Sequence, residues 1–97
     1  MAKGYWVSVY RAISDPERLT AYDKLARSAV QAAGGHVLSR GGRVVAHEAG
    51  ITQRVVLIEF DSFEQAVAAY ESEAYQKALV ALPDSVQRDF RIIEGLD

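Results

Sequence analysis

The chain of 97 residues has no cysteine, only two prolines and one methionine. Without cysteine it forms neither disulfides nor thiolate-based sites, and it is compatible with a reducing compartment. No segment approaches the roughly 20 apolar residues that span a bilayer. The first residues, MAKGYWVSVYRAI, lack the apolar core and cleavage site of a signal peptide. We therefore expect a cytoplasmic protein without a membrane partner.

An excess of charge of either sign is also missing. The chain has 11 Lys and Arg against 13 Asp and Glu, which gives a net charge of −2 and does not favour a nucleic-acid partner. Hydrophobic residues make up 49% and charged residues 25%, which is typical of a folded globular protein. At this length we expect one domain covering residues 1–97.

The first strong pattern is that of a strand with two apolar faces. Residues 4–13, GYWVSVYRAI, are rich in the aromatic and β-branched residues that favour strands. Side chains alternate between the two faces of a strand. One face therefore carries Tyr5, Val7 and Val9, and the other carries Trp6, Ser8 and Tyr10. Because both faces are apolar, we expect both to be covered.

The segment SDPERLTAYDKLARSAVQAAGG predicts a helix. Asp15 can cap its N-terminus, with Pro16 in the first turn. Alternatively, Ser14 can form a capping box with Glu17, and both options stay open. Gly34 is well placed to end the helix in a left-handed conformation. Apolar residues at helical spacing predict a buried stripe of Leu19, Tyr22, Ala26, Ala29, Val30 and Ala33.

Two short strand-like segments follow, HVLS and RVVAHE, with Gly41 and Gly42 between them. They form either the arms of a tight hairpin or one long strand with a bulge at the glycines. We favour the bulged strand, because such short arms make a poor hairpin. The next segment, QRVVLIEFDS, has the strongest strand pattern in the sequence. Its two faces carry Val55, Leu57 and Glu59 on one side and Val56, Ile58 and Phe60 on the other.

The segment SFEQAVAAYESEAYQKALVALP predicts a second helical region. Ser72 followed by Glu-Ala-Tyr indicates a new helix start, so we expect a break there and a short helix to about Leu82. The expected buried stripe is Phe63, Ala66, Val67, Tyr70 and Ala74. The segment VQRDFRIIEGL predicts a last strand, in which Arg88, Asp89 and Arg91 are expected to form a solvated face.

The order of these elements is β-α-β-β-α-β, which is typical of an α+β, ferredoxin-like fold. Its helices pack on one face of a four-stranded antiparallel sheet. The other face is expected to carry apolar residues from every strand, a patch too large to leave exposed. We therefore predict a homodimer in which two copies pack sheet to sheet.

Two groups of residues suggest ligand sites that their context does not support. A phosphate-binding loop lies between a strand and a helix N-terminus, whereas both glycine pairs of this chain lie elsewhere. His47 and Glu48 point to opposite faces if RVVAHE is a strand. His36 and His47 share a face only if a bulge shifts the register, and Glu59 would then be the third ligand. We expect no metal and no cofactor.

Glu59 is the most informative single residue, because a carboxylate in a central strand needs a partner. Arg54, Arg43 or a tyrosine hydroxyl would make it structural, and an edge or exposed position would leave it in solvent. Alternatively, burial raises its pKa, and it acts as a catalytic acid or base beside a ligand in the cleft between sheet and helices. The expected ligand-binding residues of that cleft are Tyr22, Arg54, Tyr70, Ser72 and Tyr75.

Several ordered motifs make the chain similar to a known family. GYW, GGHVLSRGG, HEAG, RVVLIEF followed by Ser62, YESEAYQ and the terminal EGL resemble domain-of-unknown-function family 1330. The resemblance implies a dimeric α+β barrel related to small monooxygenases and muconolactone isomerase-like proteins. Two departures are Ala69 before Tyr70, where members often have tryptophan, and KALVAL, where members tend to have an arginine.

The resemblance implies a small-molecule-binding barrel with possible cofactor-free activity of the monooxygenase or isomerase kind. This expectation rests on fold analogy, and fold does not fix function. Two alternatives stay open: a non-catalytic ligand-binding protein and a structural dimerisation domain.

Overall fold

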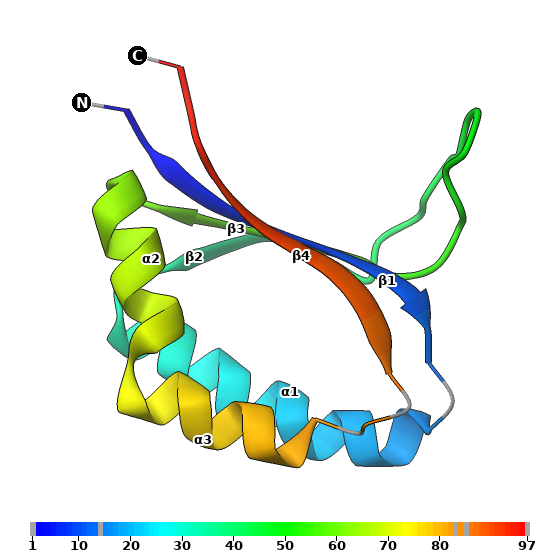
Figure 1. The fold of residues 1–97 in the computed structure, drawn as a ribbon, viewed down its shortest axis with the longest axis horizontal. Coiled ribbons are helices and arrows are strands. Elements are labelled where there is room, and N and C mark those ends of the chain that lie inside the picture. The colour runs from blue at the N-terminus through cyan, green and yellow to red at the C-terminus, as the bar shows by residue number, and fades with distance from the viewer. Residues whose placement is uncertain (1, 14, 83, 85, 97) are drawn as a thin grey trace.

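The computed structural model describes residues 2–13, 15–82, 84 and 86–96. Its elements follow the predicted order, with the second helical region split in two (Figure 1). They are β1 (Gly4–Ala12), α1 (Pro16–Ala32), β2 (His36–Arg40), β3 (Val55–Phe60), α2 (Phe63–Glu71), α3 (Glu73–Ala81) and β4 (Gln87–Glu94). Among the described residues, no helix has both the length and the apolar character needed to cross a membrane.

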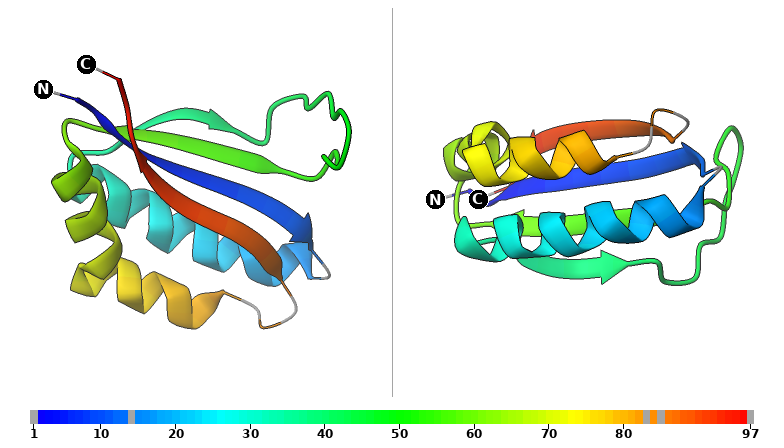
Figure 2. Two further views of the ribbon diagram at one scale, coloured as in Figure 1. Left: turned by 45° about the horizontal axis from the view of Figure 1, so that its top comes forward. Right: turned by 90° about the horizontal axis from the view of Figure 1, so that it is seen from below.

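The four strands form one antiparallel sheet in the order β2-β3-β1-β4. The helices lie on one face of this sheet, and the opposite face is uncovered in the single chain (Figure 2). The ferredoxin-like α+β architecture predicted from the order of elements is therefore confirmed.

The core lies between sheet and helices, and the predicted alternation of β1 and β3 is confirmed. Trp6 and Tyr10 are 2% and 1% exposed, and Phe60 is fully buried. The indole N–H of Trp6 donates to the Ala66 carbonyl at 2.8 Å. Its ring meets four other aromatic rings at centroid distances between 4.8 and 6.1 Å. Trp6 thus joins β1 to α2 at the centre of the core.

The ends of α1 are fixed by residues that the pattern singled out. The Asp15 carboxylate accepts a hydrogen bond from the Arg18 backbone N–H at 3.1 Å, which makes Asp15 the N-cap. The alternative cap, Ser14, lies outside the described residues. Gly34 has a φ of 83°, and the N–H groups of Gly34 and Gly35 bond back to the last turn. This left-handed residue ends the helix and turns the chain toward β2.

The long bulged strand predicted across the two central glycines is wrong. β2 ends at Arg40, Gly41 has a φ of 72°, and RVVAHE forms no strand. A residue in this left-handed conformation does not continue the pleat, so pairing stops there. The loop over residues 42–54 extends beyond the end of the sheet before β3 begins (Figures 1 and 2). A register shift does occur in β2, but earlier, between Val37 and Ser39.

The break predicted at Ser72 is confirmed, but it changes which residues are buried after it. Ser72 is extended, with φ −64° and ψ 149°, and separates α2 from α3. Because the new helix begins with a different phase, its buried residues are Tyr75 and Ala78. Ala74, which was predicted for the buried stripe, is exposed. The break therefore turns Tyr75 toward the core.

The sheet face opposite the helices is only partly apolar. Asp89 and Arg91 of β4 form an ion pair there at 3.0 Å. This edge strand contributes one apolar residue to the open face, Ile93, which pairs with Tyr5 and is 55% exposed. The two central strands do present half-buried apolar side chains on this face, namely Tyr5, Val7, Val9, Val55 and Leu57.

Candidate functional site

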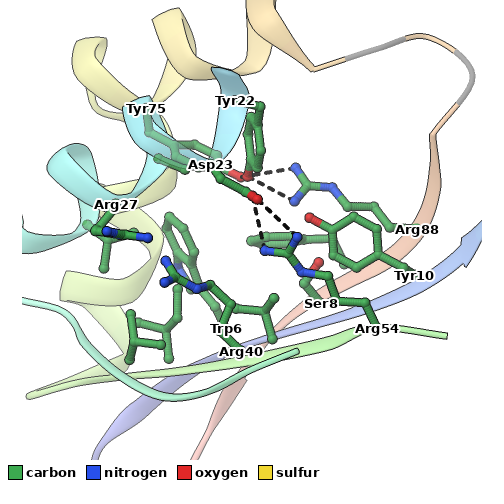
Figure 3. A pocket seen from close by; sticks show the side chains of 16 residues that line it. Trp6, Ser8, Tyr10, Tyr22, Asp23, Arg27, Arg40, Arg54, Tyr75 and Arg88 are labelled. Carbon is green, nitrogen blue, oxygen red and sulfur yellow. Dashed lines mark hydrogen bonds and ion pairs between the residues drawn. The ribbon is translucent and has the colours of Figure 1, made fainter. Parts of the chain in front are cut away.

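A cavity of about 40 Å³ lies between the helix-covered face of the sheet and helices α1 and α3 (Figure 3). This volume holds a few water molecules or a small chemical group. Its walls combine the apolar side chains of the core with an unusual number of charged ones. The labelled lining residues are Trp6, Ser8, Tyr10, Tyr22, Asp23, Arg27, Arg40, Arg54, Tyr75 and Arg88.

Three side chains from three elements meet at one end of this cavity. The hydroxyls of Tyr22 on α1 and Tyr75 on α3 are hydrogen-bonded at 2.5 Å. Arg88 on β4 donates to both, from Nη1 to Tyr22 and from Nη2 to Tyr75, each at 3.0 Å. The fixed fork of the guanidinium therefore holds the two hydroxyls next to one another. We call Tyr22, Tyr75 and Arg88 the donor cluster.

The surroundings set the protonation state of the donor cluster. Burial raises the pKa of the Tyr22 and Tyr75 hydroxyls, so both are neutral phenols at neutral pH. Burial by itself would lower the pKa of Arg88, but the two tyrosine oxygens outweigh it and raise that pKa. Arg88 therefore keeps its positive charge in a half-buried position.

The donor cluster has more hydrogen-bond donors than acceptors. Two phenols supply two O–H hydrogens, and only one of these can lie between the two oxygens. Arg88 accepts neither, because a guanidinium only donates. Its charge lies over the rings of Tyr22 and Phe90, at 5.2 and 4.9 Å, and no described carboxylate forms an ion pair with it. One phenolic hydrogen and one positive charge thus remain available to an acceptor in the cavity.

Two further polar atoms at the cavity have no partner within the described part of the chain. Ser8 is only 3% exposed, and its hydroxyl makes no hydrogen bond. The Nε of Arg54 is likewise buried without a partner. A buried polar group without a partner costs roughly 1–3 kcal/mol. Both residues line the cavity, so a polar molecule bound there would satisfy them.

Arg54 and Asp23 form the second charged feature of the cavity. The two terminal nitrogens of Arg54 donate to the two carboxylate oxygens of Asp23, each at 3.0 Å. The guanidinium also lies 5.3 Å from the centre of the Tyr10 ring. Asp23 is the one carboxylate among the lining residues, and Arg54 engages both of its oxygens.

A second, wider surface hollow of about 330 Å³ adjoins the cavity and is also lined by Thr20, Lys24 and Gly41. Asp23, Arg27, Arg40 and Arg54 line both spaces. Together the two spaces hold five of the chain's 11 Lys and Arg but only one of its 13 Asp and Glu. A protein with a net negative charge thus concentrates positive charge at this one place, which attracts anions.

The structure brings three of the five predicted ligand-binding residues together at the cavity: Tyr22, Arg54 and Tyr75. Tyr70 does not line it, and packs instead on Trp6, Tyr75 and Phe90. Ser72 does not line it either, because its hydroxyl caps α3 and donates to the Ala69 carbonyl.

Glu59 lies on the sheet face away from the cavity, so its predicted place among the cleft residues is wrong. It pairs with Tyr5 in the register of the sheet and accepts a hydrogen bond from the Tyr5 hydroxyl at 3.1 Å. This bond satisfies the carboxylate by a tyrosine hydroxyl, one of the structural alternatives considered for it. Strand alternation separates it from Phe60 and the cavity. A catalytic role for Glu59 stays a prediction, and it would have to act on the open face.

Arg88 was expected on a solvated face, and this is wrong because it lies on the helix side of β4. The alternation of Val86, Arg88, Phe90 and Ile92 was the available signal, since it places one charge in an apolar row. Asp89 and Arg91 do lie on the other face, as predicted.

No group of three potential metal ligands comes together among the described residues, and His47 lies in the loop rather than in the sheet.

Comparison with known proteins places the chain in a family. The model of the domain of unknown function DUF1330 matches residues 3–96, so the chain belongs to this family. No curated protein matches it. The family has no established function, and membership therefore supplies a fold and no reaction.

Solved structures similar to this chain support the same fold. A protein of unknown function from Rhodopseudomonas palustris has a TM-score of 0.72 at 16% identity, covering 99% of this chain and 84% of that one. A candidate antibiotic biosynthesis monooxygenase from Nitrosomonas europaea has a TM-score of 0.55 at 20% identity, covering 99% and 93%. A protein from Thermobifida fusca, described as dimeric and ferredoxin-like, has a TM-score of 0.55 at 12% identity, covering 98% and 92%. At these identities the likeness concerns the fold alone.

Proposed function

We propose that this DUF1330 protein binds a small organic carboxylate in the cavity between the sheet and helices α1 and α3. The observation that carries the proposal is the donor cluster. Arg88 has a charge without a described carboxylate partner, and one hydrogen of the Tyr22–Tyr75 pair has no acceptor in the cluster. A carboxylate supplies both the opposite charge and the acceptor oxygens.

The remaining walls suit such a ligand. The unpartnered hydroxyl of Ser8 would donate to a carboxylate oxygen. Trp6, Val30 and Ile58 would contact the carbon atoms of the ligand. The cavity of about 40 Å³ admits the acid group and a short part of the chain attached to it.

Binding is a better-supported function than acid–base catalysis. A general base needs a free acceptor near the substrate, and the one carboxylate of the cavity, Asp23, is engaged by Arg54. Cofactor-free monooxygenase- or isomerase-like activity remains part of the proposal only by analogy of fold. In such a reaction the donor cluster would stabilise an enolate oxygen as negative charge develops.

The test uses Trp6, which lines the cavity and is the only tryptophan of the chain, as a fluorescent reporter. Titration with acetate, propanoate, butanoate and benzoate should give saturable changes for the wild type. Arg88→Gln should weaken binding about tenfold or more, because a hydrogen bond to a charged group is worth roughly 1.5–3 kcal/mol. Arg18→Gln removes an equal charge from an exposed position and should leave the affinity unchanged.

Two results would contradict the binding proposal. One is no saturable change with any of the four acids. The other is an equal affinity in the wild type and in Arg88→Gln. Far-UV circular dichroism must show that Arg88→Gln is folded. Ser8→Ala is a second variant of the same site, and it removes only one hydroxyl group.

We further propose that two copies associate through the open sheet face. Its central strands present half-buried apolar residues, including Val7 and Leu57, that a second copy would cover. Val7→Asp should therefore give a monomer in sedimentation equilibrium while the wild type is a dimer. Val80→Asp, at a position 85% exposed on α3, is the matched control and should remain dimeric. A monomeric wild type at micromolar concentration would refute this proposal.

A structural dimerisation domain without a ligand is the main alternative. It predicts a dimer together with a cavity that binds none of the acids, so the two experiments distinguish it from the binding proposal. A cytoplasmic location is common to both and remains a prediction, testable by fractionation of the native host.

A further inference from the structure

We infer that the ligand is a dicarboxylate, whose second acid group is bound by Arg27, Arg40 and Lys24 in the adjoining surface hollow, which we call the mouth of the site. This inference rests on the proposed function, because it assumes that the first carboxylate lies at the donor cluster. It adds the chemical class of the ligand and the residues that select it.

The two spaces adjoin one another and share four lining residues, Asp23, Arg27, Arg40 and Arg54. Arg27 on α1 and Arg40 on β2 line both the cavity and the surface hollow. Figure 3 shows them on the side of the cavity away from Arg88. A ligand anchored at Arg88 therefore extends toward Arg27 and Arg40 if it is longer than one acid group.

The cations at the mouth have no carboxylate partner within the described part of the chain. Lys24, Arg27 and Arg40 are all exposed, and none of them takes part in an ion pair there. Asp23, the one acid nearby, is engaged by Arg54 at 3.0 Å. Three like charges around one hollow repel one another, and a second carboxylate at this point relieves that repulsion.

The residue types favour a carboxylate as the second group. Two of the three cations are arginines, whose planar forks match the two oxygens of a carboxylate. They belong to different elements, α1 and β2, so a group between them is held from two sides. A ligand with one acid group would leave this end of the site without an anion.

The experiment compares dicarboxylates with monocarboxylates of equal carbon number, followed by Trp6 fluorescence. The probes are succinate, glutarate and adipate against butanoate, pentanoate and hexanoate. In the wild type, the best dicarboxylate should bind about tenfold more tightly than its monocarboxylate, since each exposed charge contact contributes modestly. The advantage should shrink as ionic strength rises from about 0.01 M to about 0.15 M, because the mouth is exposed to solvent.

Variants identify the residues responsible. The double variant Arg27→Gln, Arg40→Gln should remove the dicarboxylate advantage, because dicarboxylate affinity should fall about tenfold more than monocarboxylate affinity. Arg43→Gln, in the exposed loop outside both spaces, is the charge-matched control and should keep the advantage. Both altered residues are exposed, and circular dichroism checks that the double variant folds.

The outcomes separate this inference from the proposed function. The wild type could bind the two acid classes with equal affinity, and Arg88→Gln could lose binding of both. That result would overturn the inference of a dicarboxylate ligand but leave carboxylate binding in place. A dicarboxylate advantage that survives the double variant would also overturn it. Binding of neither class would overturn the proposed function, and this inference with it.

Discussion

Ser8→Ala removes the hydroxyl that faces the cavity from β1 and separates a ligand-binding role from a structural one. Ser8 is 3% exposed and its hydroxyl has no partner among the described residues, although it lies in the middle of a paired strand. A hydroxyl kept for stability would have a protein acceptor or donor. A hydroxyl kept for a ligand can lack one until the ligand binds.

The two roles predict different changes in the free energy of unfolding and in the carboxylate affinity. A buried hydroxyl without a partner costs roughly 1–3 kcal/mol, and a water molecule in the cavity would cancel part of this cost. Ser8→Ala should therefore leave the free energy of unfolding of the ligand-free protein unchanged or raise it by about 1 kcal/mol. Carboxylate affinity should fall about tenfold, because a hydrogen bond to an ionised group is lost.

The assay combines urea unfolding of the ligand-free protein with the Trp6 titration. Ser39→Ala, at an exposed position of β2, is the matched control and should change neither quantity. Destabilisation of the ligand-free protein by more than about 1 kcal/mol would show that the hydroxyl has a structural partner. Together with an unchanged affinity, that result would refute the assignment of Ser8 to a ligand.

Two further predictions concern titration and chain geometry. Folding raises the pKa of Tyr22 and Tyr75 above the usual value near 10, so the folded state holds these protons more tightly. The stability from this shift is complete below about pH 10 and falls as pH rises above it. Urea unfolding across that range should show the fall, and a double Tyr→Phe variant at these positions should lack most of it. Gly34→Ala should lower the free energy of unfolding by about 1 kcal/mol or more, since Gly34 has a φ of 83° and a Cβ there would meet the Gln65 side chain. Gly42→Ala, whose Cβ would lie 3.6 Å from the nearest atom, should have a much smaller effect, and equal effects would contradict the reasoning.

Sequence patterns predicted only part of the candidate site. Tyr22, Arg54 and Tyr75 were expected at a ligand site because of their side-chain chemistry, and all three line the cavity. Glu59 was expected beside them, but alternation places it on the other face of the sheet. Arg88 completes the donor cluster, yet its neighbours in the sequence gave it the appearance of a solvated residue.

The sequence alone determined the local features of this protein. Strand alternation in β1 and β3, the start of α1 at Asp15, its end at Gly34 and the break at Ser72 each depend on a few adjacent residues. Backbone sterics and short-range hydrogen bonds act over such distances, so the pattern was sufficient. Gly41 is the exception. A tight hairpin and a bulged strand were both compatible with the residues around it, whereas in the structure β2 ends before Gly41 and a loop follows.

Only the tertiary structure decided which face of the sheet the helices cover and which side chains meet between the sheet and the helices. Both faces of β1 are apolar in the sequence, so alternation could not assign one of them to the helices. The donor cluster joins positions 22, 75 and 88, which come from three different elements. Their meeting depends on how α1 and α3 pack across the sheet, and such long-range packing is not encoded in any single stretch of residues.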